Sequence, residues 1–354
     1  MRKKIFIVLL VLISAIACVF GIAGCNNKPD SNGDNQDTNN EQGSDGHVHE
    51  YGSWTVTKEA TCSEEGSHER TCTKCDYTQI ETISKKGHTF NKDNICTVCE
   101  YELEYTTGLA YEEYTVRYNE TYYIVTGMGT ATDKDLVIPA YHAGKEVKKI
   151  AASAFSGKDA LTSVYIANGI EQIGEKAFEY CTSIEKITLP ESLNKLLSKY
   201  SNGTTGTFIG YYDNVGKSAF YGCQKLTDIN LPDRGTIIGE CAFEGTAYFK
   251  NVKNWDKGVL YIGNHLITTN ENFTATSYTV SKDVVSIADK AFYGKSALKE
   301  FIISEAAYPR IGDNALKASG ITKAEVSYYH GENQLKYLPA SNITDLTVHG
   351  NIYE

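Results

Sequence analysis

The chain of 354 residues lacks the short motifs that mark common catalytic and nucleotide-binding sites. It contains no G-x-S-x-G elbow, no P-loop and no EF-hand loop, and Gly127-x-Gly129 lacks the third glycine of a dinucleotide-binding turn. Four histidines have no partner at a catalytic spacing, and each is expected to be a solvated loop residue: His142, His265, His330 and His349. We therefore predict that the protein is not an enzyme.

Positive charge is scarce as well. The chain has 34 Lys and Arg residues against 44 Asp and Glu residues, a formal net charge of −10. No stripe of basic residues offsets this excess, so a polyanion such as DNA would be repelled. We expect no nucleic-acid partner.

A long apolar run occurs at the N-terminus. Three basic residues precede the apolar residues 5–20, and Ile22-Ala23-Gly24-Cys25 follows, an order typical of a secretory signal peptide. The run is short for a membrane span and has no basic flank on its far side. The last four residues resemble the lipobox of bacterial lipoproteins, which implies removal of residues 1–24 and lipidation of Cys25. Plain cleavage near Ala23, with Cys25 incidental, is the alternative.

The segment after Cys25 has no aromatic or branched aliphatic residue up to position 46. A segment of this composition cannot bury a core, so residues 25–46 are predicted to be a disordered polar tether. A lipid followed by a tether predicts display on the extracellular face of the cell membrane. The membrane is then a partner through the lipid anchor.

Disulfides are not the pattern that the ten cysteines favour. Cys18 leaves with the signal peptide, and three cysteines lie far apart in the C-terminal part: Cys181, Cys223 and Cys241. Five crowd together before residue 100: Cys62, Cys72, Cys75, Cys96 and Cys99. An odd number containing two C-x-x-C pairs indicates metal ligands, with disulfide pairing as the alternative. Residues 47–100 are thus predicted to form a small zinc-ribbon-like module.

Two groupings of zinc ligands agree with the spacing. The pairs at 72/75 and 96/99 would form a four-sulfur site of the form C-x2-C-x20-C-x2-C. Alternatively, the first site is a complete Cys3His site made of His49, Cys62, Cys72 and Cys75. The remaining residues, His88, Cys96 and Cys99, would then form an incomplete second copy. The metal is expected to be structural, because about fifty residues with few aliphatic side chains cannot fold on core burial alone.

The order of residues in this module carries a resemblance. Between positions 49 and 88 the chain has, in order, His49, Tyr51, Trp54, Ala60-Thr61-Cys62, Gly66, Arg70, Cys72, Cys75 and Gly87-His88. This run resembles a repeat common in surface proteins of Gram-positive bacteria, whose units hold one His and three Cys. The resemblance implies the grouping of Cys62 with His49. The second unit departs from the pattern, because His88 leads to Cys96 without an Ala-Thr-Cys of its own.

A six-residue pattern, I/V-G/A-x-x-A-F, recurs from residue 150 onward. The copies are Ile150–Phe155, Ile173–Phe178, Val215–Phe220, Ile238–Phe243, Ile287–Phe292 and a degenerate Ile311–Leu316. Phe155 and Phe178 are 23 residues apart, and so are Phe220 and Phe243. A fixed period in the twenties predicts a solenoid whose units bury their apolar side against their neighbours.

Each unit also contains a predicted short strand. Apolar residues lie six, nine and eleven positions after Phe155, Phe178, Phe220 and Phe292, as in Leu161, Val164 and Ile166, and indicate alternate burial along a strand. After Phe243 the sixth position is Phe249. The glycine after each isoleucine tolerates conformations closed to other residues, so we expect it to serve a turn. Cys181 and Cys223 occupy the same place in two units, where buried thiols are favoured over a disulfide.

Residues 101–354 resemble BspA-type leucine-rich repeats. The stretch from Ile170 to Pro190 matches the repeat I-P-x-x-V-x-x-I-G-x-x-A-F-x-x-C-x-x-L-x-x-I-x-I well. This implies a β-rich leucine-rich-repeat solenoid of short strands, with turns or short helical segments on the outer side. The family is associated with surface binding and adhesion and has no common catalytic residue.

Two insertions interrupt the period, near 191–214 and 255–277. The first carries Tyr211 and Tyr212; the second contains a predicted hairpin at 259–267 and part of a degenerate repeat ending at Val280. Insertions in solenoids often form the binding surface, although loops that touch nothing are equally compatible with the pattern. Candidate ligand-binding residues are these two tyrosines and the outward strand positions Tyr165, Thr188, Asn230, Ile302 and Glu325.

We therefore predict a lipid-anchored surface protein that binds or adheres to a macromolecule, a protein or glycan of host or bacterial origin. The alternative is a passive spacer or assembly scaffold. An extracellular zinc hydrolase would need an open metal position and a placed base, and no H-E-x-x-H spacing supplies them.

Overall fold

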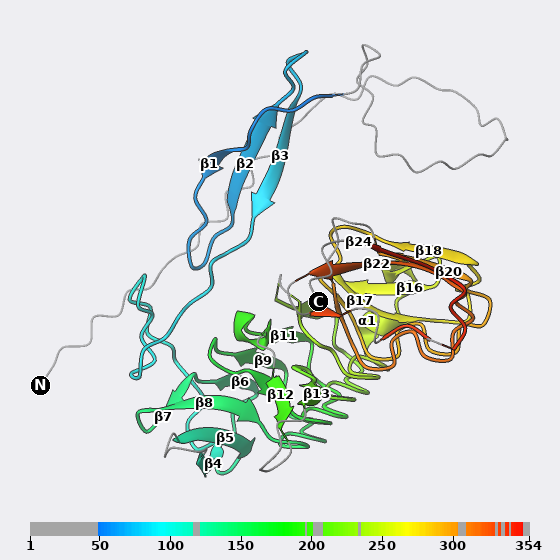
Figure 1. The fold of residues 1–354 in the computed structure, drawn as a ribbon. Coiled ribbons are helices and arrows are strands. Elements are labelled where there is room, and N and C mark those ends of the chain that lie inside the picture. Colours follow the sequence, from blue (N-terminus) through cyan, green and yellow to red (C-terminus); the bar gives the residue numbers. More distant parts are fainter. Residues whose placement is uncertain are drawn as a thin grey trace, which may run out of the picture. The chain divides into compact units, whose positions relative to one another are not determined.

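Figure 1 shows a computed structural model of the chain. It describes residues 49–115, 121–194, 197–200, 208–232, 235–303, 309–329, 332–333, 337–339 and 341–349. The predicted signal peptide at 1–24, the predicted tether at 25–46 with Cys25, the first two residues of the predicted module and His330 lie outside these residues. Within the described ranges, no helix has both the length and the apolar character that crossing a membrane requires.

The chain divides into two compact units. One consists of Met1–Gly52 and Thr71–Tyr77, and the other of Ser53–Arg70 and Thr78–Glu354. The division passes through the module predicted for residues 47–100.

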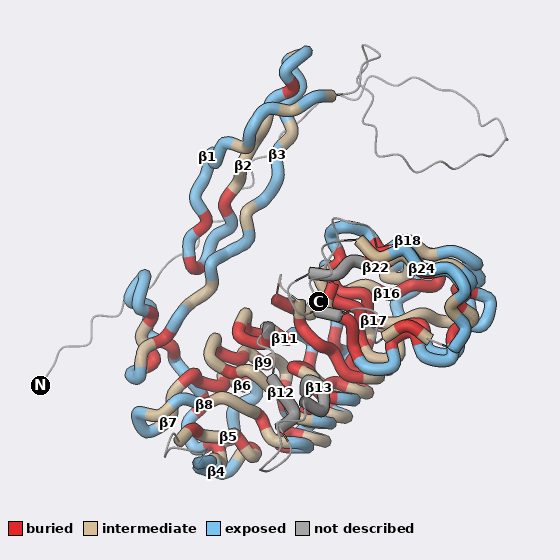
Figure 2. The backbone as a smooth tube through the Cα atoms, viewed as in Figure 1, coloured by how far each residue is buried: buried red, intermediate tan, exposed pale blue. Residues whose placement is uncertain are grey.

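The module contributes a three-stranded sheet with almost no apolar core. Its strands are β1 (Thr55–Lys58), β2 (Gly66–Thr71) and β3 (Thr78–Ile83), in that order. All of β1 and most of β3 are exposed, whereas β2 is mostly half-buried (Figure 2). Stacked side chains contribute contacts to this sheet: the Trp54 and His68 ring centroids are 4.1 Å apart, and the Arg70 guanidinium lies 4.5 Å from the centre of the Trp54 ring. A small sheet without a buried face needs further support.

The first part of the solenoid contains two rows of strands. The row β14-β11-β9-β6 is parallel throughout and consists of β6 (Asp135–Ile138), β9 (Ser163–Ile166), β11 (Lys186–Thr188) and β14 (Asp228–Asn230). The other row contains β4 (Ala110–Thr115), β5 (Thr121–Gly127), β8 (Lys145–Ile150) and β10 (Gln172–Ile173), with β7 (Tyr141–His142) beside β8. Single bridges continue this row through Val215 and Ile238.

The later turns repeat this arrangement. One row is β15 (Trp255–Asp256), β16 (Val259–Ile262), β17 (His265–Thr269), β19 (Ser286–Ile287) and β21 (Arg310–Ile311). The other contains β18 (Ser277–Val280), β20 (Glu300–Ile303), β22 (Lys323–Tyr329), β23 (Glu332–Asn333) and β24 (Asp345–His349). The predicted row of one strand per unit is therefore present, and the structure adds a second row, which the sequence did not predict and which contains Ile173, Ile287 and Ile311.

Both insertions contain hairpins. The first holds the 3-10 helix η2 (Glu191–Asn194) and the antiparallel pair β12 (Leu197–Tyr200) and β13 (Phe208–Tyr212). In the second, β16 and β17 form the predicted hairpin, and β17 then pairs in parallel with β19. The predicted degenerate repeat is β18, parallel to β20. The second insertion is thus built into the solenoid.

A stack of phenylalanine rings forms the centre of the first core. Neighbouring rings from Phe155 through Phe178 and Phe220 to Phe243 have centroids 5.0, 5.2 and 5.5 Å apart, with planes within 9° of parallel. All four side chains are fully buried, and Figure 2 shows buried segments recurring along these turns. The 23-residue period predicted this arrangement of one ring above another.

The stack ends after Phe243. Instead of a strand, the chain forms α1 (Ala247–Lys250), capped by Thr246, whose Oγ1 accepts from the Phe249 N–H. The 3-10 helix η3 (Val252–Asn254) follows. Phe249 is therefore a partly exposed helix residue, and its assignment to a buried strand is wrong. Phe292 belongs to a second core, where it packs against Phe273, Tyr278 and Phe301.

The glycines after the isoleucines serve close packing rather than a left-handed turn, so the turn interpretation is wrong. A Cβ on Gly174 would lie 2.5 Å from the Ala152 nitrogen, and one on Gly216 2.6 Å from the Glu175 nitrogen. Positive φ values, between 54° and 58°, occur two residues later and at residues other than glycine: Ser153, Lys176, Ser218, Cys241, Lys290 and Asn314. Contact between successive backbones thus dictates the glycine.

Cys181, Cys223 and His265 are among the polar or sulfur-containing side chains that are buried in the solenoid with defined partners. The Cys181 and Cys223 thiols donate to the carbonyls of Phe155 and Phe178 at 3.0 and 3.2 Å, and neither forms a disulfide. His265 was expected in a solvated loop, but it lies in β17 and is 1% exposed. Its Nδ1 is 2.7 Å from the Ser286 hydroxyl, and its Nε2 is 2.7 Å from the Pro232 carbonyl oxygen. The expectation failed because its partners are 21 and 33 residues away.

Candidate functional site

The first three outward strand positions form one row across the sheet. Thr188 is in register with Tyr165 on one side and with Asn230 on the other. Beside this row the Lys186 ammonium lies 2.9 Å from the Asp228 carboxylate. The alternation predicted for these strands therefore places the three side chains on the same face.

Tyr165 lies against other parts of the protein. It packs on a small cluster with Val137 and Tyr141, and the buried members of that cluster are Cys62, Phe90, Cys96, Leu103, Ala140 and Ala167. Burial raises the pKa of the Tyr165 hydroxyl. Thr188 is half-buried and Asn230 is exposed, so the accessible part of this row begins at Thr188.

The other two outward positions belong to a different sheet. Ile302 is in register with Glu325, and the row continues to Thr279 on one side and Thr347 on the other. The Glu325 carboxylate is 2.7 Å from His349 Nε2. The predicted row of five is therefore two shorter rows, separated in the chain by α1 and the β15–β17 strands. Tyr211 and Tyr212 lie in β13, and their side chains are outside what the structure describes.

A cleft of about 480 Å³ lies where the second insertion meets the solenoid turns. Its aromatic walls are Phe249, Trp255 and Tyr293, and its acidic residues are Glu240, Glu244, Glu271 and Asp289. Lys290 also lines it, with its ammonium 2.8 Å from the Glu240 carboxylate. That hydrogen bond and a second one from Lys217 lower the pKa of Glu240.

Sequence reasoning missed the cleft. Its residues come from the Phe243 turn, α1, the hairpin and the Phe292 turn, and no spacing along the chain connects them. The interrupted period near 255–277 was the one available signal.

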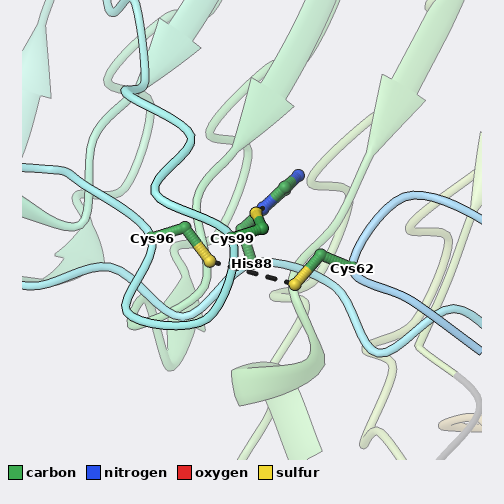
Figure 3. A group of neighbouring side chains, drawn as sticks. All are labelled: Cys62, His88, Cys96 and Cys99. Carbon is green, nitrogen blue, oxygen red and sulfur yellow. Dashed lines mark hydrogen bonds between the residues drawn. The ribbon is translucent and has the colours of Figure 1, made fainter.

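The predicted metal ligands fall into two groups, and neither matches the groupings drawn from spacing. Cys62, His88, Cys96 and Cys99 place one ligand atom each within 4.8 Å of one another, and so do His49, Cys72 and Cys75. Figure 3 shows the Cys62 and Cys96 sulfurs turned toward each other, with Cys99 and His88 beside them. Cys62 joins the second unit because the chain between Cys62 and Cys96 folds back on itself across 34 residues, which local spacing does not reveal.

The four-residue group is suited to a cation. The Cys62 and Cys96 sulfurs are 3.9 Å apart, and the Cys99 sulfur is 3.3 Å from His88 Nδ1. Burial raises the pKa of the Cys96 thiol, but hydrogen bonds from the backbone N–H groups of Cys99 and Val98 and from the His88 and Cys99 side chains together lower this pKa to about 5. The thiolate, which is the form that binds metals, is therefore favoured for Cys96 at neutral pH, whereas burial and the neighbouring Cys99 and Cys96 raise the pKa of the Cys62 thiol to about 11.

Comparison with known families decides what kind of solenoid this is. The model described as "BspA type Leucine rich repeat region" matches residues 138–204 and 213–333 in six copies, more than half of the chain. The chain belongs to this family. The predicted leucine-rich-repeat solenoid is thus confirmed. No curated protein matches the chain.

Similar solved structures include other leucine-rich-repeat proteins of bacteria. A T. pallidum leucine-rich-repeat protein is 16% identical over 67% of this chain and 78% of its own, with a TM-score of 0.29. A leucine rich cell surface protein of Faecalibacterium prausnitzii is 16% identical over 71% of this chain and 96% of its own, with a TM-score of 0.23. The pneumococcal vaccine antigen PcpA is 16% identical over 70% of this chain and 82% of its own, with a TM-score of 0.25.

Proposed function

We propose that this protein is a non-enzymatic binding or adhesion protein, held at the extracellular face of a bacterial cell membrane by a lipid on Cys25. Membership in the BspA-type repeat family supports a binding role, since solenoids present extended surfaces to macromolecular ligands. The signal-like N-terminus supports the location. The ligand is a protein of a host or bacterial surface, with a surface glycan as the alternative.

The cleft beside the second insertion is the observation on which the binding proposal rests. Carboxylates outnumber cations in its lining, and Lys290 is already paired with Glu240. Tyr293 is 47% exposed, and the Lys290 ammonium already lies 5.3 Å from the centre of its ring, so a ligand would meet the remaining exposed part of this side chain. A basic side chain on a protein ligand would meet both carboxylates and aromatic faces there, which is the pairing that arginine favours.

Binding can be tested with the mature chain carrying Cys25→Ser, applied to an array of extracellular proteins and glycans. For the proteins that bind, Glu271→Lys and Tyr293→Ala should each weaken binding about 10-fold or more. Asp283→Lys and Tyr105→Ala likewise change an acidic residue and a tyrosine, at exposed positions outside the cleft lining, and should leave binding unchanged. No bound protein or glycan would favour the passive spacer, and a hit insensitive to both cleft variants would place the contact elsewhere.

The lipid anchor has a separate test. In the native host, the wild-type chain should sediment with membranes and Cys25→Ser should appear in the medium. Retention of the Cys25→Ser chain in the membrane fraction would contradict anchoring through this residue.

A further inference from the structure

The two Cys/His clusters are built on the same local backbone structure. In one, Cys72 forms an antiparallel bridge with Tyr51 and its N–H donates to the Tyr77 carbonyl at 2.9 Å. In the other, Cys96 bridges Phe90 and its N–H donates to the Tyr101 carbonyl at 2.8 Å. Each cluster therefore holds its C-x-x-C pair in the same tight turn.

The histidines of the two clusters correspond as well. His49 Nδ1 is 3.5 Å from the Cys75 sulfur, and His88 Nδ1 is 3.3 Å from the Cys99 sulfur. Each ring rests on the tyrosine after its pair, with centroids 4.5 Å apart for His49 and Tyr77 and 4.8 Å for His88 and Tyr101. The same geometry occurs twice in one chain and directs one ring nitrogen and two sulfurs at a common point.

Cys62 distinguishes the two clusters. It adds a third sulfur to the His88 cluster, whereas the ligand group around His49 has three members among the described residues. A tetrahedral zinc with ordinary bond lengths separates two sulfurs by about 3.8 Å and a sulfur from a nitrogen by about 3.6 Å. The observed 3.9 and 3.3 Å are close to these edges, and all four cysteine and histidine ligand atoms lie within 4.8 Å.

We propose that Cys62, His88, Cys96 and Cys99 form one structural zinc site, in which the first repeat unit lends its cysteine to the second. Cys62 precedes β2, so its thiolate would tie the β1–β2 turn to the C-x-x-C turn at residues 96–99. Three thiolates and one imidazole fill the tetrahedron, so the zinc has no position for a substrate. This proposal is independent of the ligand cleft.

The same site lies directly against the start of the solenoid. The Asn94 side chain exchanges two hydrogen bonds of 3.1 Å with the backbone of Tyr141, and Thr106 and Val137 are joined by two of 3.0 Å. Phe90 and Leu103, on either side of the C-x-x-C turn, are buried with Ala140 and Ala167. Loss of the metal would therefore loosen the contact between residues 88–106 and strands β6, β7 and β9, in addition to the three-stranded sheet.

Metal analysis of the mature chain tests the ligand set. After dialysis against EDTA the wild type should keep about one zinc per chain, while Cys62→Ser should release that zinc to a chromogenic chelator about 100-fold faster. Cys72→Ser, which alters the other cluster, and Cys241→Ser, a solenoid cysteine outside both, should keep it. Hydrogen exchange of the amides around Asn94 and Tyr141 should accelerate on zinc removal, with the amides around Phe220 unchanged. A wild type without retained zinc, a disulfide at Cys62, or wild-type release from Cys62→Ser would overturn the proposal.

Cobalt provides a readout that does not depend on a foldable variant. One equivalent of Co²⁺ added to the zinc-free wild type should give tetrahedral visible bands and a charge-transfer intensity corresponding to three thiolates. An octahedral spectrum, or an intensity corresponding to two thiolates that persists when Cys72→Ser removes a ligand of the other cluster, would refute the participation of Cys62.

Discussion

Replacement of Gly216 by alanine tests the spacing of successive backbone turns. The added Cβ would lie 2.6 Å from the Glu175 nitrogen and 2.7 and 2.9 Å from the carbonyl carbon and oxygen of Gly174. All three are backbone atoms, so no side chain can rotate away. The turns are also tied together by the hydrogen bond from the Gly216 N–H to the Ile173 carbonyl, 2.8 Å long.

The expected cost follows from this geometry. Forcing a methyl group into a packed site costs about 1–3 kcal/mol, and the fixed backbone places Gly216→Ala near 3 kcal/mol. Without a clash, the same substitution at a φ that alanine tolerates would stabilise the protein by about 0.4–1 kcal/mol, because alanine restricts the unfolded chain. If Gly216 is required for close packing, Gly216→Ala lowers the free energy of unfolding; if it is not, the substitution raises it.

Gly157→Ala is the matched control. Its φ is 68°, and a Cβ there would meet nothing within 4 Å, so it isolates backbone strain of about 1 kcal/mol. Urea unfolding followed by circular dichroism, at fixed zinc concentration, measures both variants. Hydrogen exchange should place the loss for Gly216→Ala in residues 173–177 and 215–219. A Gly216→Ala protein as stable as the wild type would refute the close-packing argument.

Three further predictions concern the solenoid. Burial raises the pKa of Cys181 to about 11 and that of Cys223 to about 12, so both should resist iodoacetamide at pH 8 in the folded protein and react once urea unfolds it; fast labelling of either would contradict their burial. His265→Leu should cost about 2–3 kcal/mol in urea unfolding, since it strands the Pro232 carbonyl and the Ser286 hydroxyl, and a neutral effect would show that these bonds contribute little. Three carboxyl groups have a pKa below the ordinary 3.8 or 4.5 because each accepts a hydrogen bond: Asp135 from Ser163, Glu240 from Lys290 and Glu300 from Lys323. The stability that these ionised carboxylates contribute to the fold is present above pH 4.5 and is lost as the pH falls through the lowered pKa values. Acid unfolding of Ser163→Ala should accordingly depend less on pH than that of the wild type, and an identical profile would contradict the assignment.

The repeat architecture could be predicted because each unit encodes its own geometry locally. Apolar residues such as Leu161, Val164 and Ile166 return at the same offsets, so equivalent side chains must stack when the units do. The same logic placed Tyr165, Thr188 and Asn230 side by side. Where the period broke, as at Phe249, prediction from the pattern failed.

The sequence also did not predict which residues have a left-handed backbone conformation. Lys176 and Cys241 hold φ values of 58° with side chains that disfavour them, so composition gave no sign of the turn. The turn was assigned instead to the glycines two residues earlier, such as Gly174 and Gly239. Those glycines are needed because the backbone of the preceding turn lies too close for a Cβ.

Period and polarity along the chain were enough to establish a solenoid with a Cys/His module before it, because both follow from interactions between residues fewer than about thirty positions apart. Folding alone decided that Cys62 lies with Cys96, that one predicted row became two, and that Trp255 and Glu271 share a cleft with Lys290. Those groupings join segments whose separation follows no repeat, and they depend on how whole turns pack against each other.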